Sequence, residues 1–156
     1  MESCTLRRWV TLPALRAQRS PGAKVAVARG MCEGLRYLHN DATIVAERGV
    51  IHRDLKPENV LLARGDPWPT PKLIDFGEAK AQENTVTCSV AIGTIGWQAP
   101  EQMMQEPCTK RSDVFSLGLV LFFLVTDGKH ALDPPRMHQV HLATLGFPAG
   151  VGAVAL

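Results

Sequence analysis

The chain has 156 residues and a hydrophobic content of 46%, which is enough to form the core of one domain. Its formal net charge is only +2 and its basic residues are scattered, so the composition argues against DNA as a partner. The four cysteines form no C-x-x-C pair, and this spacing predicts reduced thiols in the cytoplasm.

The first half of the chain predicts one long helix followed by two short strands. Apolar side chains recur at helical spacing over residues 23–40, and "SPG" just before them is a start signal. The runs "GVIH" at 49–52 and "NVLLA" at 59–63 predict strands on either side of a polar loop.

The next segment predicts a turn, a third strand and a long loop. "RGDPWPTP" at 64–71 holds three prolines and a glycine, which indicates a turn. "KLID" at 72–75 then predicts a strand. Residues 78–94 are polar, rich in Thr and Ser and without periodicity, and loops of that length in compact domains are commonly functional.

The stretch "SDVFSLGLVLFFLVTDG" at 112–128 predicts a buried helix with Ser112 as its N-cap and Gly128 as its stop. It is apolar on nearly every face, so we expect it in the middle of the domain. Gly118 costs helix stability, which predicts close packing against the polar loop. The apolar run at 114–125 is shorter than the roughly 20 residues of a membrane-spanning helix, so no transmembrane segment is predicted. The elements show no βαβ alternation and predict an α+β, mainly helical fold.

The polar loop between the first two strands carries side chains suited to phosphoryl transfer. Asp54 can accept a proton from a hydroxyl nucleophile, and Lys56 can stabilise negative charge on a phosphate. Asn59 offers a neutral oxygen to a hard cation such as Mg²⁺. Because the proline-rich turn returns the chain on itself, we expect Asp75 to lie near Asn59 and complete a metal site. A base, metal ions and a positive charge are what phosphoryl transfer requires.

Four motifs in order resemble the signature set of the eukaryotic protein kinases. They are "HRDLKPEN" (52–59), "DFG" (75–77), "GTIGWQAPE" (93–101) and "DVFSLG" (113–118). The resemblance implies a kinase-like large lobe over residues 1–156, from the end of the hinge through the core helix. The small lobe and the last helices of the large lobe would be missing from it.

The resemblance assigns a role to each matching position of the loop. Asp54 would be the catalytic base, and Lys56 would contact the transferred phosphate. Asn59 and Asp75 would hold Mg²⁺. Lys56 and the Gly-Thr pair at 93–94 are similar to serine/threonine kinases rather than tyrosine kinases. These matches imply transfer of phosphate from ATP, with Mg²⁺, to Ser or Thr of a protein substrate.

Other matching positions would bind adenine or align the two lobes of a kinase. His52 and Phe76 would stack in a hydrophobic column between the lobes, beside Gly77 of the "DFG" motif. Leu61 would form part of the floor under adenine. The backbone groups offered to adenine would come from the end of the hinge, at Glu2 and Cys4.

Three further matches concern how the loop is held and regulated. Thr94 would form a hydrogen bond near the base, and Asp113 would tie the core helix to the backbone of the loop. Arg53 would pair with a phosphate on the long loop and so order it. The candidate phosphorylation sites are Thr85, Thr87 and Ser89.

Parts of the family's pattern are absent from the 156 residues. The sequence has no G-x-G-x-x-G loop and no V-A-I-K-like strand lysine, so we expect the chain by itself to be inactive. In the family, Glu101 would pair with a late arginine, and Arg136 is the only arginine beyond the core helix. An unpaired buried carboxylate there would cost about 3–5 kcal/mol. The chain is therefore interpreted as a fragment of a larger kinase.

Two longer stretches resemble a narrower family, the inositol-requiring kinase/endoribonuclease of the unfolded-protein response. They are "GTIGWQAPEQM" at 93–103 and "DVFSLGLVLFFLVTDGKHAL" at 113–132, although "HALD" stands where that family has "HPFG". This resemblance implies a homodimer and a parent anchored in the endoplasmic reticulum membrane, and it assigns no nuclease residue here. The alternatives are a generic serine/threonine kinase and a non-catalytic pseudokinase or scaffold fragment.

Overall fold

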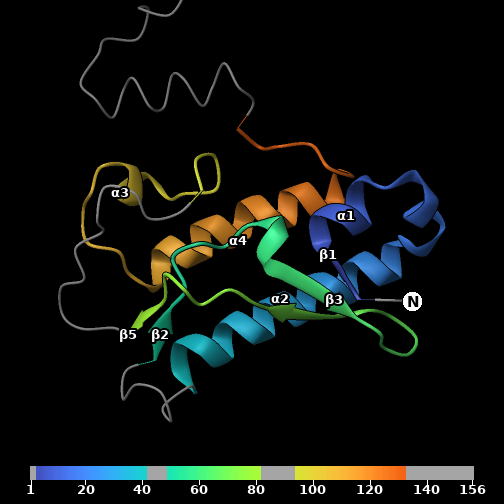
Figure 1. Ribbon diagram of the computed structural model, residues 1–156, viewed down its shortest axis with the longest axis horizontal. Coiled ribbons are helices and arrows are strands. Elements are labelled where there is room, and N and C mark those ends of the chain that lie inside the picture. Colours follow the sequence, from blue (N-terminus) through green and yellow to red (C-terminus); the bar gives the residue numbers. More distant parts are fainter. Residues whose placement is uncertain (1–2, 42–48, 82–93, 133–156) are drawn as a thin grey trace, which may run out of the picture.

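The computed structural model describes residues 3–41, 49–81 and 94–132, and Figure 1 shows their arrangement. Helices dominate, and two small antiparallel sheets lie beside them. In chain order the elements are β1 (Cys4–Thr5), α1 (Leu6–Thr11), the 3-10 helix η1 (Pro13–Gln18), α2 (Pro21–Asn40), β2 (Val50–Ile51), the 3-10 helix η2 (Pro57–Asn59), β3 (Val60–Ala63), β4 (Thr70–Leu73), β5 (Lys80–Ala81), α3 (Pro100–Met103) and α4 (Lys110–Val125).

Helix α2 confirms the first predicted helix and begins two residues earlier than expected. Ser20 is its N-cap, because the Ser20 hydroxyl accepts a hydrogen bond of 3.2 Å from the N–H of Ala23. Pro21 occupies the first helical position, where its missing N–H costs nothing. The buried side chains Val27, Met31 and Leu35 recur every four residues and place one face of α2 in the core.

Helix α4 begins at Lys110, so the prediction of Ser112 as its N-cap was wrong. The N-cap is Thr109, whose hydroxyl accepts from the N–H of Arg111. Ser112 is instead the third helical residue, and its hydroxyl accepts from the N–H of Thr109. Thr and Ser are both preferred N-cap residues, so the residue type alone does not distinguish Thr109 from Ser112, and the backbone angles decide which one flanks the helix.

One face of α4 is exposed in the described structure, so the expectation of burial on nearly all sides was wrong. Val114, Phe115, Phe122 and Val125 are 58%, 38%, 40% and 57% exposed. Gly118 lies on this face, and a Cβ placed on it would have no neighbouring atom of residues 3–41, 49–81 or 94–132 within 4 Å. The predicted close packing of Gly118 against the polar loop is therefore also wrong, because the opposite face of α4 is the one turned to the core.

The larger sheet has the strand order β1-β3-β4, with all neighbours antiparallel. Strands β3 and β4 form the hairpin predicted around the proline-rich turn, although β4 begins at Thr70 and ends at Leu73, two residues ahead of the prediction. In β1, Cys4 pairs with Leu62 and Thr5 with Leu61. Helix α2 packs along β4, and α4 packs against α2 (Figure 1).

The second sheet consists of β2 and β5, which pair Val50 with Ala81 and Ile51 with Lys80. Strand β5 lies inside the segment 78–94, which was predicted to be loop throughout. A strand of two residues leaves no alternating pattern to detect. The pairing brings the residues after the "DFG" motif alongside the strand that leads into the polar loop.

Gly49 lies against the end of α2 immediately before β2. It has φ +80°, and a Cβ built on it would lie 1.9 Å from the carbonyl oxygen of His39. Only glycine accepts both this conformation and this approach of two backbones. The entry to β2 is thus in contact with the last turn of α2.

Two findings bear on the compartment predicted from the cysteines and the hydropathy. Cys108 is disulfide-bonded, so the expectation of reduced thiols is wrong for this residue, whereas Cys4 and Cys32 are free. The spacing of cysteines in a sequence does not show which of them meet in space. Among the described helices, none combines the length and the apolar character required to cross a membrane.

Candidate active site

The loop between β2 and β3 gathers the side chains predicted for phosphoryl transfer around the carboxylate of Asp54. The Asp54 Oδ2 atom accepts from Lys56 Nζ at 2.7 Å and from Asn59 Nδ2 at 3.0 Å. The Oδ1 atom accepts from both the N–H and the hydroxyl of Thr94, each at 3.0 Å. Lys56 Nζ also donates to the Thr94 hydroxyl at 2.7 Å. Donors from two distant segments therefore fix the orientation of one carboxylate.

The burial of this network suits it to proton transfer and to stabilising charge. The side chains of Lys56 and Asp54 are 20% and 11% exposed, so both are mostly shielded but still reachable. A carboxylate held in this way can accept a proton from a hydroxyl group that approaches it. The adjacent ammonium group can stabilise negative charge on a neighbouring phosphate.

Asp113 of α4 holds the backbone of the loop. Its carboxylate, 1% exposed, accepts hydrogen bonds of 2.8 Å from the N–H groups of His52 and Arg53. Arg53 has φ +69°, a conformation that costs a residue other than glycine roughly 1–2 kcal/mol. Charge-assisted hydrogen bonds of the kind that Asp113 makes contribute about 1.5–3 kcal/mol each and can offset that cost.

Asp75 lies beside the loop because both of its neighbours contact it. The N–H of Ile74 donates to the carbonyl of Asn59 at 3.0 Å, and the carbonyl of Ile74 lies 3.1 Å from His52 Nε2. The rings of His52 and Phe76 are 5.1 Å apart. Asp75 itself is exposed, and its Oδ1 atom accepts a long hydrogen bond of 3.4 Å from the N–H of Gly77.

The residues predicted to bind Mg²⁺ have a donor set that fits this ion. Asn59 is 5% exposed and uses its Nδ2 group on the carbonyl and carboxylate of Asp54, which leaves its amide oxygen as the ligand atom. Asp75 adds a carboxylate. Mg²⁺ is typically bound by one or two carboxylates together with phosphate oxygens and water. Within the described ranges, no cluster of three His, Cys, Asp or Glu side chains could hold a metal by itself.

The guanidinium of Arg53 is buried and only partly paired. Its Nε atom donates to the backbone carbonyl of Glu78, and its Nη2 atom is 4.0 Å from the Glu78 carboxylate. The Nη1 atom is buried and has no hydrogen-bond partner among the residues that the structure describes. Burial lowers the pKa of Arg53, against the opposing effect of Glu78 and Asp113. The candidate phosphorylation sites Thr85, Thr87 and Ser89 lie outside the described residues.

Glu101 is not left without a partner, contrary to the prediction. It is half-buried at the start of α3, and its Oε1 atom accepts a hydrogen bond of 2.7 Å from the hydroxyl of Ser112 on α4. The prediction considered only arginines and overlooked this neutral donor. The cost assigned to a fully unpaired carboxylate therefore does not apply.

Two of the residues predicted to contact adenine lie on the larger sheet, Cys4 on the edge strand β1 and Leu61 on the central strand β3. Leu61 is half-buried on β3 and pairs with Thr5, next to Cys4 on β1. Burial raises the pKa of the Cys4 thiol, and the nearby Arg8 opposes this shift. Glu2 lies outside the described residues. Cys4 and Leu61 thus lie on neighbouring strands, and their contact with adenine stays a prediction.

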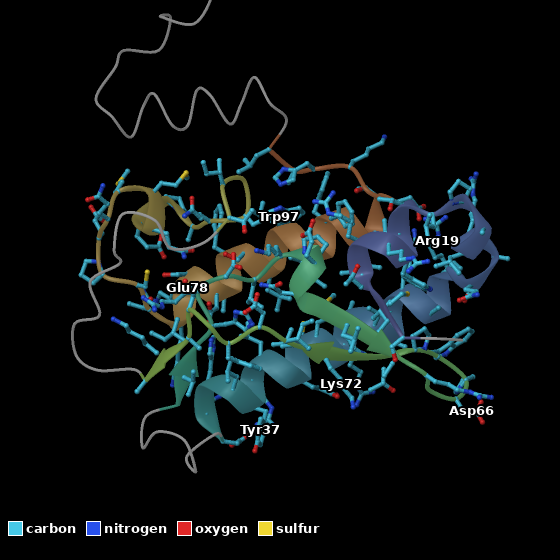
Figure 2. The ribbon with its side chains drawn as sticks, viewed as in Figure 1. Arg19, Tyr37, Asp66, Lys72, Glu78 and Trp97 are labelled. Carbon is cyan, nitrogen blue, oxygen red and sulfur yellow. The ribbon has the colours of Figure 1, made fainter. Side chains whose placement is uncertain are left out.

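Three residues close to this site were not singled out from the sequence. His39 contacts Asp113, with its Nε2 atom 2.7 Å from Oδ2. Glu78 lies next to the Arg53 guanidinium and is labelled in Figure 2. The same figure labels Trp97, whose ring centroid lies 5.7 Å from that of Phe123 on α4. Gln102 contacts the backbone of Arg53. A polar residue carries no sequence signal for a partner many positions away.

Comparisons with known proteins agree with this geometry. The family model described as "Protein kinase domain" matches residues 5–142, so the chain belongs to the protein kinase family. A chain from the crystal structure of the yeast RNA Pol II CTD kinase CTDK-1 complex has the same fold, with a TM-score of 0.70 at 18% identity. That match covers 93% of this chain and 43% of the other.

Several curated relatives come from Arabidopsis thaliana. The leucine-rich repeat receptor-like protein kinase PEPR2 is 43% identical over 78% of this chain, which spans 11% of the relative. "Probable serine/threonine-protein kinase PBL8" is 42% identical over 72% of this chain, which spans 26% of the relative. The serine/threonine-protein kinase/endoribonuclease IRE1b is 42% identical over 65% of this chain, which spans 11% of the relative. The chain therefore matches about a quarter or less of each of these proteins.

Proposed function

We propose that this chain is the large-lobe part of an ATP-dependent protein serine/threonine kinase. The observation that carries the proposal is the carboxylate of Asp54, held by Lys56, Asn59 and Thr94 at 2.7–3.0 Å. In this proposal residues 1–156 run from the end of the hinge through the core helix, and the small lobe belongs to the parent protein. The names of two relatives, both serine/threonine kinases, support the choice of Ser and Thr as acceptors.

Each residue of the loop has a part in the proposed reaction. Asp54 orients the hydroxyl of the protein substrate and accepts its proton as the oxygen attacks the γ-phosphate of ATP. Lys56 stabilises the negative charge on the transferred phosphate, and Thr94 keeps Asp54 and Lys56 in register. The protein thereby contributes positioning and electrostatic stabilisation.

The nucleotide would bind between this chain and the parent's small lobe. Asn59 and Asp75 would hold Mg²⁺, which neutralises charge on the phosphates when it is bound. Leu61 would lie under adenine, and backbone groups of Glu2 and Cys4 would contact its edge. Because the Gly-rich loop and the strand lysine of the family are absent from residues 1–156, the chain alone is expected to be inactive.

Regulation would act through Arg53. A phosphate on Thr85, Thr87 or Ser89 would supply an anionic partner for the buried Nη1 atom, which has none in the described structure. Such a pairing would order the segment before Thr94, and Thr94 is the residue that contacts Asp54.

A second candidate is a kinase/endoribonuclease of the unfolded-protein-response type. Its support is the 42% identity to IRE1b and the two motif stretches at 93–103 and 113–132. In that case the parent would work as a homodimer anchored in the endoplasmic reticulum membrane, with this part in the cytoplasm. The same level of identity to PEPR2 favours a receptor-like kinase equally.

The first experiment is transfer of labelled phosphate from ATP, with Mg²⁺, to peptides that contain Ser, Thr or Tyr. We expect the parent protein to label Ser and Thr peptides and the 156-residue chain to label none. Asp54→Asn should lower kcat by at least about a hundredfold, since general base catalysis contributes about 10²–10⁴-fold. Asp66→Asn, an exposed matched substitution, should leave the rate unchanged. Labelling that survives Asp54→Asn would overturn the assignment of the base.

Transcript sequence upstream of codon 1 provides an independent check of the fragment proposal. An upstream reading frame that encodes a Gly-rich loop and a strand lysine is the expected result. A stop codon immediately upstream, in every transcript, would contradict the proposal of a parent small lobe.

A further inference from the structure

Gln102 uses both ends of its side-chain amide although it lies on a helix of only four residues. The residue is 5% exposed, near the start of α3. Its Oε1 atom accepts a hydrogen bond of 2.9 Å from the N–H of Ala99. Its Nε2 atom donates a hydrogen bond of 2.9 Å to the backbone carbonyl of Arg53, 49 positions earlier in the chain.

The first of these two bonds is a local one. Gln at the third helical position commonly reaches back to the N–H of the N-cap residue, which here is Ala99. Glu serves this purpose equally well, because only an acceptor is needed. The bond to Arg53 is different, since it requires the N–H of an amide and contributes nothing to the cap. Capping alone therefore does not account for the way Gln102 is used.

The second bond completes the set of hydrogen bonds that hold both backbone groups of Arg53. Asp113 Oδ1 accepts the N–H of Arg53 at 2.8 Å, and Gln102 binds the carbonyl of the same residue. Arg53 is held at φ +69°, which few residues other than glycine adopt. The carbonyl of Arg53 belongs to the peptide bond with Asp54. Because that peptide is planar, fixing its oxygen restrains the plane that carries the N and the Cα atoms of Asp54, from which its side chain leaves the backbone.

The segment 94–103 thus contacts Asp54 in two ways. Thr94 binds the carboxylate directly, and Gln102 binds the peptide that precedes Asp54. From this geometry we propose that Gln102 is a positioning residue, which sets the orientation of Asp54 by holding the carbonyl of Arg53. The inference rests on the proposed function in its catalytic consequence, and its structural part can be measured without catalysis.

Two substitutions separate the capping bond from the bond to Arg53. Gln102→Glu keeps the acceptor for Ala99 and lacks the donor to Arg53, whereas Gln102→Met lacks both. Gln105→Met is the matched control, because Gln105 is exposed on the same segment. In the parent kinase we expect Gln102→Glu and Gln102→Met each to lower kcat by about 10- to 100-fold with KM for ATP and peptide nearly unchanged.

A role confined to stability would give a different kinetic result. Both substitutions would then reduce the amount of folded enzyme and leave the rate per folded molecule at the level of Gln105→Met. That outcome would overturn the proposal. A rise in KM with unchanged kcat would overturn it as well, because the misoriented group would then not be the base.

Amide hydrogen exchange in the 156-residue chain tests the same inference when the parent shows no kinase activity. The N–H of Thr94 donates to Asp54 Oδ1, so its exchange rate reports the position of that carboxylate. We expect about tenfold faster exchange of Thr94 in both Gln102 variants, relative to the N–H of Val120 in α4, and no change in Gln105→Met. Equal acceleration at Thr94 and Val120 would indicate only global destabilisation and would overturn the proposal. Absence of phosphate transfer by the wild-type parent would instead overturn the proposed function.

Discussion

Asp113 is the residue whose replacement tests most directly how the polar loop between β2 and β3 is held. Its two oxygens accept N–H groups of the loop, His52 on Oδ2 and Arg53 on Oδ1, at 2.8 Å each. His39 Nε2 lies 2.7 Å from Oδ2. The substitution Asp113→Asn preserves the size of the side chain and turns one acceptor into an NH₂ group. Because each oxygen of Asp113 accepts a backbone N–H group of the loop, the new NH₂ group must point at one of these buried donors.

The expected magnitude follows from these contacts. A buried N–H group that loses its acceptor costs about 1–3 kcal/mol, and the hydrogen bond that remains changes from charge-assisted to neutral. Asp113 is 1% exposed, so water cannot replace the lost acceptor. We therefore expect Asp113→Asn to lower the free energy of unfolding by about 3 kcal/mol. For a marginally stable domain this is a large share of the total.

Urea denaturation followed by tryptophan fluorescence measures this loss. Trp9 and Trp97 are buried, so unfolding transfers both indoles to water. The midpoint should fall at unchanged m-value, since the surface exposed on unfolding stays the same. Asp66→Asn, an exposed control in the β3–β4 turn, should change stability by less than about 0.5 kcal/mol. A loss below about 1 kcal/mol for Asp113→Asn would refute the reasoning.

Two further substitutions have smaller expected effects. Gly118→Ala should raise the free energy of unfolding, measured by urea denaturation, by about 0.5–1 kcal/mol, because the described residues that surround this face of α4 place no atom within 4 Å of the added methyl group. A destabilising result would mean that this face is covered. Asp127→Asn should lower stability by about 0.2–1 kcal/mol at pH 7, since Lys24 Nζ lies 2.9 Å from the half-exposed carboxylate and lowers its pKa. Because the pKa of Asp127 is lowered in the folded state, its ion pair stabilises the protein above the ordinary aspartate pKa, and this stability is lost as the pH falls through the folded pKa. The unfolding free energies of the wild type and Asp127→Asn should therefore converge in acid, and also in high salt. A difference that persists in acid would contradict the ion pair.

Local patterns predicted the elements whose signal lies in the sequence itself. Helix α2 combines an apolar stripe with a Ser-Pro start, and its structure departs from the prediction only by the two residues that the cap accounts for. The N-cap of α4 was misplaced because Thr109 and Ser112 satisfy the same rule, and the choice depends on backbone angles. Strand β5 was missed because its formation depends on β2, 30 residues earlier.

The contacts of the candidate site are likewise of two kinds, those within one loop and those between elements far apart in the sequence. Asp54, Lys56 and Asn59 lie within one loop, so their spacing alone indicated that they would meet. The contacts of Glu101 with Ser112 and of Gln102 with Arg53 join elements that only the folded chain brings together. Polar residues carry no periodicity that indicates which partner they will find, and for this reason both contacts escaped the sequence analysis.

The contact between the backbones of Gly49 and His39 also limits which amino acids position 49 can accept. Main-chain atoms alone govern the spacing there, so no compensating change of side chain elsewhere could accommodate even one extra methyl group. Such a group would press on His39, and His39 is in contact with the carboxylate of Asp113, which binds the backbone of the polar loop. Position 49 should therefore tolerate no other amino acid.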